Sequence, residues 1–361
     1  MLGNTFGRLF RVTTCGEAYG EALQIIIDGV PSGLKLSEAD IQPDLDRRRP
    51  GQSEITSPRK ETDKVKIVAG VLNGYTTGAP VGMIIYNVDT PPRLIELYEK
   101  NKELAIPAHA DYTYYVKYGR FRDWRGCGRA NGRETAGRVA AGAVAKKLLA
   151  REGVQVVAYT KAMGGIYARE MTFKEIVAGV EKNIARCPDP EAAEKMIQRA
   201  IEVKKQGDSI GGIVEVIARG MPPGIGDPVF DKLSANIAKA LMSIGSVKGV
   251  EIGAGFALAD KLGSESNDSP YIDGDQIRFR TNNAGGLLGG ITNGEDIVAR
   301  IVVKPTPLIS IEQHTVNMVK MQNVTLVSKT PHDPVIAPRI VPVAEAMMAL
   351  VLVDQLMMWR G

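Results

Sequence analysis

The chain has 361 residues, 44% of them hydrophobic and 24% charged, which is typical of a globular protein with a substantial core. The net charge of +4 is slight for this length, so it favours small anionic ligands over an extended nucleic-acid surface. Three scattered cysteines (Cys15, Cys127 and Cys187) argue against a disulfide framework, and three widely spaced histidines argue against a metal site. We therefore expect a cytoplasmic protein with no nucleic-acid partner and no bound metal.

The sequence predicts no membrane anchor. Its first ten residues lack the apolar core of a signal peptide. The most apolar segment, residues 340–359, contains Glu345 and Asp354 and is too interrupted to span a bilayer. We expect this segment to form a buried helix, and we expect no membrane partner.

Short apolar runs predict seven strands, and capping residues and prolines predict six helices between them. Residues 260–280 are polar and rich in turn-forming residues, so we expect a long surface loop there. Strands separated by helices at irregular intervals favour an α+β sandwich over a doubly wound parallel sheet. In chain order, strands are expected at 10–14, 23–28, 65–71, 81–87, 154–159, 213–218 and 297–303, and helices after Ser37, Arg133, Thr172, Pro190, Phe230 and Pro342.

Similar short motifs recur in the same order in both parts of the chain. They predict one domain over residues 1–361 with an internal pseudo-repeat of two halves, roughly 1–155 and 205–361. The paired sites are Gly29-Val-Pro-Ser-Gly33 and Gly220-Met-Pro-Pro-Gly224, Gly74-Tyr-Thr-Thr-Gly78 and Gly290-Ile-Thr-Asn-Gly294, and Glu134 and Glu345, at separations of 191, 216 and 211 residues.

The stretch 109–142 carries the strongest functional signal. Glycines let backbone N–H groups converge, and a helix N-terminus adds a positive dipole end. Guanidinium groups bind carboxylates and phosphates bidentately, and His109 is a nearby candidate proton donor. The pattern therefore predicts an anion-binding loop rather than a solvated basic face. Six arginines lie within nineteen residues, at positions 120, 122, 125, 129, 133 and 138, interrupted by Gly126, Gly128 and Gly132 before an Ala-rich segment.

Three common enzyme motifs are not supported. The sequence contains no Gly-x4-Gly-Lys-Ser/Thr phosphate loop and no Gly-x-Ser-x-Gly nucleophile elbow. Gly253-Ala-Gly255 is followed by Leu258 where a dinucleotide-binding fingerprint has its third glycine. We therefore do not expect a nucleotide hydrolase, a serine hydrolase or a Rossmann dehydrogenase.

Ten short segments form a pattern that runs in order from residue 3 to about residue 350. They are Gly3-Asn-Thr-Phe-Gly, Phe10-Arg-Val-Thr-Thr, Asp44-Leu-Asp-Arg-Arg-Arg-Pro-Gly, His109-Ala-Asp-Tyr-Thr, Arg133-Glu-Thr-Ala, Gly207-Asp-Ser-Ile-Gly, Lys248-Gly-Val-Glu-Ile-Gly, Thr281-Asn-Asn-Ala-Gly-Gly, Lys304-Pro-Thr and His332-Asp-Pro. Together these segments resemble the chorismate synthase family. The resemblance implies a cytoplasmic homotetramer with a β-α-β sandwich fold that binds reduced FMN. It also implies a carbon–oxygen lyase that converts a small anionic cyclohexene, 5-enolpyruvylshikimate 3-phosphate, to chorismate by 1,4-anti elimination of phosphate without net redox change.

The resemblance also implies which residues form the site. His109 matches the histidine that protonates the departing phosphate, and Asp333 matches the base near flavin N5. Arg48, Arg49 and Arg133 are expected to bind the substrate. The source of the flavin electrons, NADPH or another donor, stays open. The expected FMN contacts are Arg129, Ala130, Asn131, Gly245, Ser246, Gly289, Lys304, Pro305, Thr306, Pro307 and Leu308.

The chain departs from the family pattern at several positions. Tyr19 stands in place of the histidine that protonates reduced flavin, and a phenol with a pKa of about 10 is a poorer proton shuttle near neutrality. Arginines of the family pattern are replaced at Glu54, Ile106 and Pro331, and each lost contact to a buried anion costs about 2 kcal/mol.

These departures leave three interpretations open. The chain is a working chorismate synthase, or a paralogue that keeps the FMN site but acts on a less anionic cyclohexene, or a catalytically silent FMN-binding subunit. Retention of His109 and Asp333 argues against the silent subunit.

Overall fold

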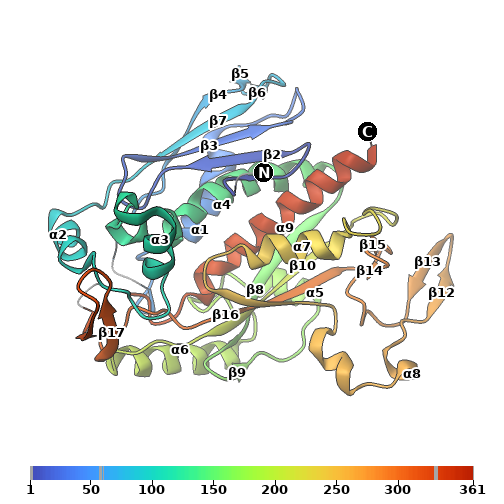
Figure 1. The fold of residues 1–361 in the computed structure, drawn as a ribbon. Helices are drawn as coiled ribbons and strands as arrows, with labels where there is room; N and C mark the ends of the chain where they lie inside the picture. Colours follow the sequence, from blue (N-terminus) through green and yellow to red (C-terminus); the bar gives the residue numbers. More distant parts are fainter. Residues whose placement is uncertain (1–2, 57–58, 60, 329–331, 361) are drawn as a thin grey trace.

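The computed structural model describes residues 3–56, 59, 61–328 and 332–360. Two sheets of five strands each enclose a layer of helices (Figure 1). The strand order is β1-β2-β3-β7-β4 in the first sheet and β11-β16-β10-β8-β9 in the second, and all neighbouring strands are antiparallel. The predicted α+β fold, a β-α-β sandwich, is confirmed.

Seven of the ten strands in the two sheets form where the apolar runs predicted them, because each sheet has one face on the helices; β1, β9 and β11 were not predicted. In β3, Leu23, Ile25 and Ile27 are buried, whereas Ile26 between them is 51% exposed. The first sheet comprises β1 (Thr5–Phe6), β2 (Arg11–Cys15), β3 (Ala22–Asp28), β4 (Val65–Ala69) and β7 (Val81–Tyr86). The second comprises β8 (Gln155–Met163), β9 (Ile166–Tyr167), β10 (Gly212–Arg219), β11 (Val247–Ile252) and β16 (Ile297–Val303).

Short two-stranded hairpins extend from this sandwich. They are β5 (Val71–Leu72) with β6 (Tyr75–Thr76), β12 (Pro270–Asp273) with β13 (Gln276–Phe279), β14 (Leu287–Leu288) with β15 (Ile291–Thr292), and β17 (Gln313–Asn317) with β18 (Gln322–Leu326).

Helices α1, α4, α7 and α9 form the central layer (Figure 1). Their bounds are α1 (Gln42–Arg48), α4 (Thr135–Arg151), α7 (Leu233–Met242) and α9 (Ala337–Arg360). The remaining helices are α2 (Pro92–Asn101), α3 (Asp111–Tyr118), α5 (Phe173–Gly179), α6 (Pro190–Lys205) and α8 (Gly263–Ser266), with short 3-10 turns η1 (Glu38–Asp40), η2 (Gly119–Phe121), η3 (Arg125–Ala130), η4 (Gly132–Glu134) and η5 (Gly255–Asp260).

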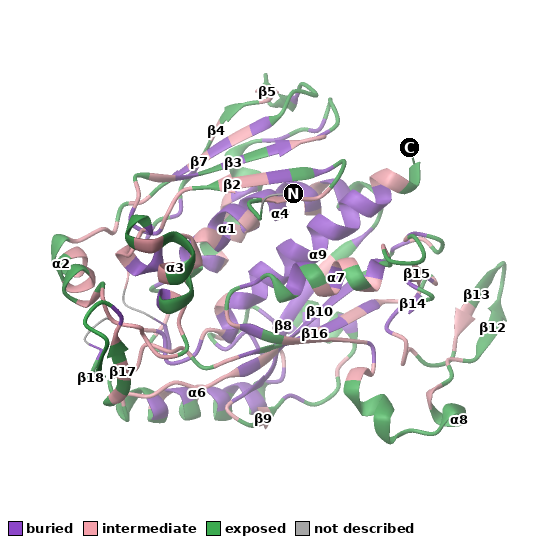
Figure 2. Ribbon diagram, in the orientation of Figure 1, coloured by how far each residue is buried: buried purple, intermediate pink, exposed green. Residues whose placement is uncertain are grey.

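Close packing of α4 against α9 forms the centre of the core. A Cβ atom at Gly142 would lie 2.3 Å from the Cβ of Ala346, so only glycine permits this approach. Among the described residues, α9 is the one helix long and apolar enough to cross a membrane. Because 94% of its apolar window is buried inside the protein, α9 is the core helix that the sequence predicts (Figure 2).

The acidic residues inside α9 all have partners. Glu345 accepts hydrogen bonds from Arg47 Nη1 at 2.6 Å, Lys146 Nζ at 3.3 Å and the Ala158 backbone N–H at 3.0 Å. Asp354 accepts the backbone N–H groups of residues 8, 9 and 10 at 2.7–3.0 Å. These two carboxylates therefore link α9 by hydrogen bonds to α1, α4, β8 and the residues just before β2.

Two predicted element boundaries were wrong. Helix α9 begins at Ala337, so Pro342 lies inside it rather than before it. Pro342 cannot donate to the Pro338 carbonyl, and this carbonyl instead accepts a hydrogen bond from Arg186 Nη1 at 2.7 Å, which makes the proline tolerable. Residues 260–280 are exposed as predicted, but they form α8 and the β12–β13 hairpin rather than a loop (Figure 2).

Matching turns support the proposal of two similar halves. The Gly33 N–H donates to Thr76 O at 2.9 Å, and the Gly224 N–H donates to Thr292 O at 2.9 Å. In both turns the threonine hydroxyl donates to the carbonyl of the proline at the third motif position, at 2.6 and 2.7 Å. The first turn follows β3 and the second follows β10, the middle strands of the two sheets. We propose that the halves are a pseudo-repeat within one domain.

Candidate active site

A cavity of about 710 Å³ lies at the N-terminal ends of the central helices α4 and α9. Among the described residues, eight basic side chains and three acidic ones line it, so it suits ligands with several negative charges. The basic residues are Arg48, Arg59, Arg129, Arg133, Arg138, Lys248, Lys304 and Arg339, and the acidic ones are Glu61, Glu134 and Asp333.

Most of the predicted site residues come together in this cavity. Of the six clustered arginines, Arg129, Arg133 and Arg138 line it. Arg122 and Arg125 instead pair with Asp111 and Asp123, and Arg120 stacks on Phe121. The other predicted residues that line it are Tyr19, Arg48, His109, Ala130, Asn131, Gly245, Ser246, Lys304, Thr306, Pro307, Leu308 and Asp333.

Three predicted contacts do not line the cavity within this chain. Arg49 follows the last residue of α1 with an extended backbone and does not line the cavity, and it pairs with Asp46 at 3.9 Å. Pro305 packs against Gly211, where a Cβ atom would lie 3.3 Å from its Cδ. Gly289 lies in the β14–β15 turn, on the opposite side of the molecule from α3 (Figure 1).

His109 belongs to a small buried cluster. Its Nδ1 lies 2.8 Å from Asp111 Oδ2, and Arg122 Nη1 lies 3.8 Å from Asp111 Oδ1. The potential ligand atoms of His109, Asp111 and Cys127 all lie within 4.8 Å of one another, close enough for a metal ion. However, burial and then Asp111 raise the pKa of the Cys127 thiol to about 12, and Arg122 already neutralises Asp111. The arrangement is better explained as a hydrogen-bonded pair of His109 and Asp111.

Tyr19 is buried beneath the glycine loop. A Cβ atom at Gly126 would lie 2.8 Å from the Tyr19 ring, and Gly126 has a φ of +56°, so glycine is required there. The Tyr19 hydroxyl lies 3.4 Å from that of Tyr98, and Arg59 stacks on the Tyr19 ring with its Cζ 5.2 Å from the ring centre. Burial and then Tyr19 raise the pKa of Tyr98, so this phenol stays protonated.

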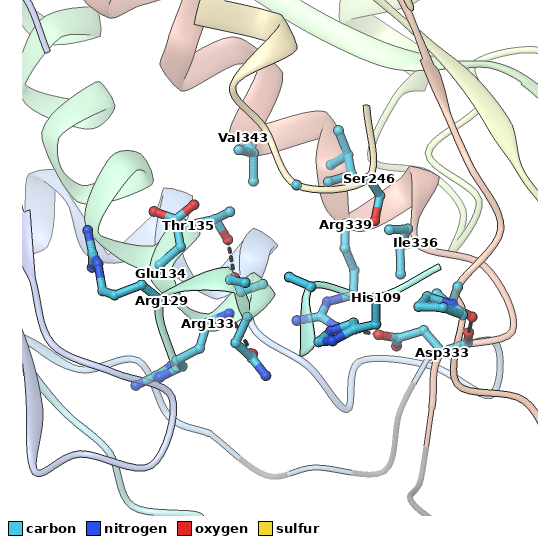
Figure 3. Close-up of a pocket in the computed structure, with 18 of the residues that line it drawn as sticks. His109, Arg129, Arg133, Glu134, Thr135, Ser246, Asp333, Ile336, Arg339 and Val343 are labelled. Atoms are coloured by element: carbon cyan, nitrogen blue, oxygen red, sulfur yellow. Dashed lines mark hydrogen bonds and ion pairs between the residues drawn. The ribbon is translucent and has the colours of Figure 1, made fainter. Parts of the chain in front are cut away.

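Asp333 lines the cavity near the start of α9. Arg339 Nη1 donates to Asp333 Oδ2 at 2.6 Å, and the Thr306 hydroxyl donates to the Asp333 carbonyl at 2.8 Å. Figure 3 shows His109, Arg339 and Asp333 gathered on one side of the cavity, with Arg129, Arg133 and Glu134 on the other.

Arg48 and Arg133 line the cavity but share a buried carboxylate. Arg48 donates to Asp63 Oδ2 from Nε at 2.9 Å and Nη2 at 2.6 Å, and Arg133 Nη1 pairs with Asp63 Oδ1. Burial opposes ionisation of Asp63, but Arg48 and Arg133 together hold its pKa below the usual value. Glu61 also pairs with Arg133 at 3.7 Å and with Arg59 at 2.9 Å, so these three arginines face two carboxylates, which leaves positive charge available for a ligand.

The predicted FMN segments meet at one wall of the cavity. The Lys304 N–H donates to the Ser246 carbonyl at 2.9 Å, and Lys304 Nζ donates to the Ala108 carbonyl. A Cβ atom at Gly245 would meet no atom within 4 Å, so its backbone is open to a ligand. Burial and then Lys248 lower the pKa of Lys304. Two neighbouring lysines beside an open glycine backbone fit a phosphate group.

Comparison with known proteins identifies the family. A family model described as chorismate synthase matches residues 10–357. The chorismate synthase of Methanococcoides burtonii is 54% identical, covering 99% of this chain and 96% of that protein. The chorismate synthase of Acetivibrio thermocellus is 52% identical, covering 100% and 96%. A crystal structure of chorismate synthase superposes with a TM-score of 0.80 at 32% identity, covering 99% and 94%. The chain belongs to the chorismate synthase family.

Membership of the chorismate synthase family makes this chain a carbon–oxygen lyase of the shikimate pathway, which serves aromatic amino acid biosynthesis. Of the three interpretations that the sequence left open, the high-coverage relatives support the working chorismate synthase. They do not favour the paralogue or the silent subunit.

Of the three positions where this chain lacks an arginine of the family pattern, Glu54 and Ile106 do not line the cavity. Glu54 is exposed, and Pro331 lies outside the described residues. Arg339, which sequence reasoning missed, places a guanidinium beside Asp333.

Four residues that matter in this chorismate synthase family site were not predicted: Arg59, Asp63, Tyr98 and Arg339. Arg339 left a signal, since it is a charged residue close to an otherwise apolar segment and six residues after Asp333. The other three lie in segments without a motif. The fold brings Arg59 and Tyr98 to the cavity and buries Asp63 against Arg48 and Arg133.

Proposed function

We propose that this chain converts 5-enolpyruvylshikimate 3-phosphate to chorismate and phosphate, with reduced FMN bound in the cavity of about 710 Å³. The reaction breaks one C–O bond to phosphate and one C–H bond, and it creates one C=C bond. The observation that carries this proposal is the union of His109, Asp333 and eight basic side chains in a single cavity.

The residues present fit a flavin mononucleotide. We propose that Lys304, Gly245 and Ser246 hold its phosphate, together with Arg129, Ala130, Asn131, Thr306, Pro307 and Leu308 along the same walls. When bound, reduced FMN supplies electron density to the cyclohexene ring transiently, so that the overall reaction has no net redox change.

The substrate carries two carboxylates and a phosphate, and the basic wall is suited to hold them. We propose that Arg48, Arg133 and Arg339 bind these groups, because their guanidinium forks match carboxylate and phosphate geometry. His109 donates a proton to the departing phosphate. Asp333, whose carboxylate is ion-paired with Arg339 at 2.6 Å, accepts the proton from the ring carbon.

An assay of the purified chain with chemically reduced FMN and 5-enolpyruvylshikimate 3-phosphate tests the proposal. We expect release of phosphate and formation of chorismate, and we expect His109→Ala to lower kcat by about 10²–10⁴-fold, the usual contribution of a positioned proton donor. The matched control is His314→Ala, since His314 is exposed and outside the cavity. No phosphate release by the unaltered chain would refute the proposed function.

We further propose that the enzyme is a cytoplasmic homotetramer. Gly289 does not line the cavity of its own chain, so we infer that a contact between Gly289 and FMN would come from a neighbouring subunit. Light scattering after size exclusion measures the subunit number. Replacing reduced FMN by FMN with NADPH in the same assay shows whether the chain reduces its own flavin.

A further inference from the structure

The imidazole of His109 is held by a buried carboxylate two residues further along the chain. We propose that Asp111 is a positioning residue that fixes the orientation of His109 and favours its protonated form. This inference rests on the proposed function, in which His109 protonates the departing phosphate.

The two imidazole nitrogens of His109 have different surroundings. Nδ1 of His109 lies 2.8 Å from Asp111 Oδ2, a hydrogen-bond distance. This contact leaves Nε2 to donate to a ligand, and His109 lines the cavity that holds the basic residues. A carboxylate on one imidazole nitrogen sets the tautomer and stabilises the imidazolium, as in other enzymes that use histidine for proton transfer.

Asp111 is itself held firmly. Its side chain is only 7% exposed, and it is the first residue of α3, where the helix dipole favours a negative charge. Arg122 Nη1 is buried 3.8 Å from Asp111 Oδ1 and has no hydrogen-bond partner among the described residues. The carboxylate therefore lies between an imidazole and a guanidinium in a setting that water screens little.

The charges around His109 oppose each other. On the cavity side, Lys304 and Arg339 disfavour an imidazolium, whereas Asp333 favours it. On the inner side, Asp111 favours it at hydrogen-bond distance, and Cys127 is a neutral thiol. The titratable and charged groups around the imidazole are Asp111 and Tyr114 on α3, Arg122, Cys127, Lys304, His332 and Asp333, and Arg339 on α9.

The direction of the effect follows from these charges. A carboxylate hydrogen-bonded to an imidazole stabilises the imidazolium, so Asp111→Asn removes a group that favours the protonated ring of His109. The protonated imidazole is the proposed proton donor, so activity should fall as the pH rises. In Asp111→Asn we therefore expect the alkaline limb of the pH profile to move about one unit lower.

The experiment compares the unaltered enzyme with Asp111→Asn, Asp111→Glu and Asp44→Asn. Asp44 is a matched control, because it also lies in the first turn of a helix and pairs with a base, Lys146 at 2.6 Å, outside the cavity. The readouts are kcat and KM for phosphate release against pH, and NMR titration of ¹³C-labelled histidine. The chain has three histidines, and the His109 signal is the one lost in His109→Gln.

We expect Asp111→Asn to lower kcat about 10²-fold, with a smaller change in KM, and to move the alkaline limb of the pH profile to lower pH. Asp111→Glu restores most of the rate, and Asp44→Asn behaves like the unaltered enzyme. A lower kcat with an unchanged pH limb and an unchanged His109 titration would overturn the inference, since it would indicate a structural role only.

Two further outcomes are also decisive. If Asp111→Asn does not fold, Asp111→Ser takes its place: an alkaline limb at lower pH supports the inference, and an unchanged limb overturns it. If the unaltered chain releases no phosphate, the proposed function fails. The NMR titration of Asp111→Asn does not depend on activity, so it still tests whether Asp111 and His109 interact.

Discussion

At the residue scale, Tyr19 is the departure from the family pattern that lies inside the site. Its phenol is buried against Tyr98 and Arg59 and lines the cavity. A phenol with an unperturbed pKa of about 10 transfers protons poorly near neutrality, whereas imidazole titrates near 6.5. We therefore predict that Tyr19→His raises kcat about 10-fold in the phosphate-release assay.

Two controls accompany this change. Tyr19→Phe keeps the ring and removes only the hydroxyl, so it should not raise kcat. Glu54→Arg adds a cation outside the cavity and should leave both kcat and KM unchanged, because Glu54 is exposed. An equal or lower rate in Tyr19→His would contradict the proton-shuttle argument.

At the scale of elements, the contact between α1, α4 and α9 depends on Glu345. Burial opposes its ionisation, but Arg47 and Lys146 hold the pKa at about 2, below the ordinary value of 4.5. This stabilisation is complete above pH 4.5 and is lost as the pH falls towards 2. We predict that Glu345→Gln lowers the free energy of unfolding at pH 7 by about 3 kcal/mol, because it removes the buried carboxylate that Arg47 and Lys146 share.

Urea unfolding at several pH values measures this effect. The stability of Glu345→Gln should depend less on pH in the acid range than that of the unaltered chain. Glu152→Gln is the matched control, since Glu152 joins α4 to Arg360 of α9 at the surface, where ion pairs contribute little. Equal losses in both variants would show that burial of Glu345 is not the cause.

At the scale of the whole molecule, the cavity joins segments from both halves of the chain, so a ligand there should stabilise the entire fold. We predict that FMN raises the Tm, since a ligand at 100 times its Kd adds about 2.7 kcal/mol. Lys304→Ala should reduce this shift, because Lys304 lines the cavity beside Lys248.

Lys147→Ala is the matched control for the thermal shift. Lys147 pairs with Asp40 outside the cavity, so the variant should keep the full response to FMN. A thermal shift that is the same in Lys304→Ala and in the unaltered chain would place the flavin phosphate elsewhere.

Much of the fold could be predicted because its signals are local. Alternating burial in β3 and the cap at Thr172 arise from neighbouring residues, and the sequence shows both. The motifs around His109, Arg129 and Lys304 likewise predicted the composition of the cavity wall. The start of α9 was missed because the Pro338 carbonyl finds its partner in Arg186, which is distant in the chain.

The sequence by itself determined the family, the sandwich and most of the residues that line the cavity, because these depend on periodicity and on motifs of a few residues. Only the tertiary structure decided how their charges are balanced. It pairs Arg48 and Arg133 with Asp63 and brings Arg339 to Asp333. It also places the β14–β15 turn, which contains Gly289, on the opposite side of the molecule from α3. The physical reason is that desolvation and pairing of a charge depend on residues far apart in the chain, which no local pattern records.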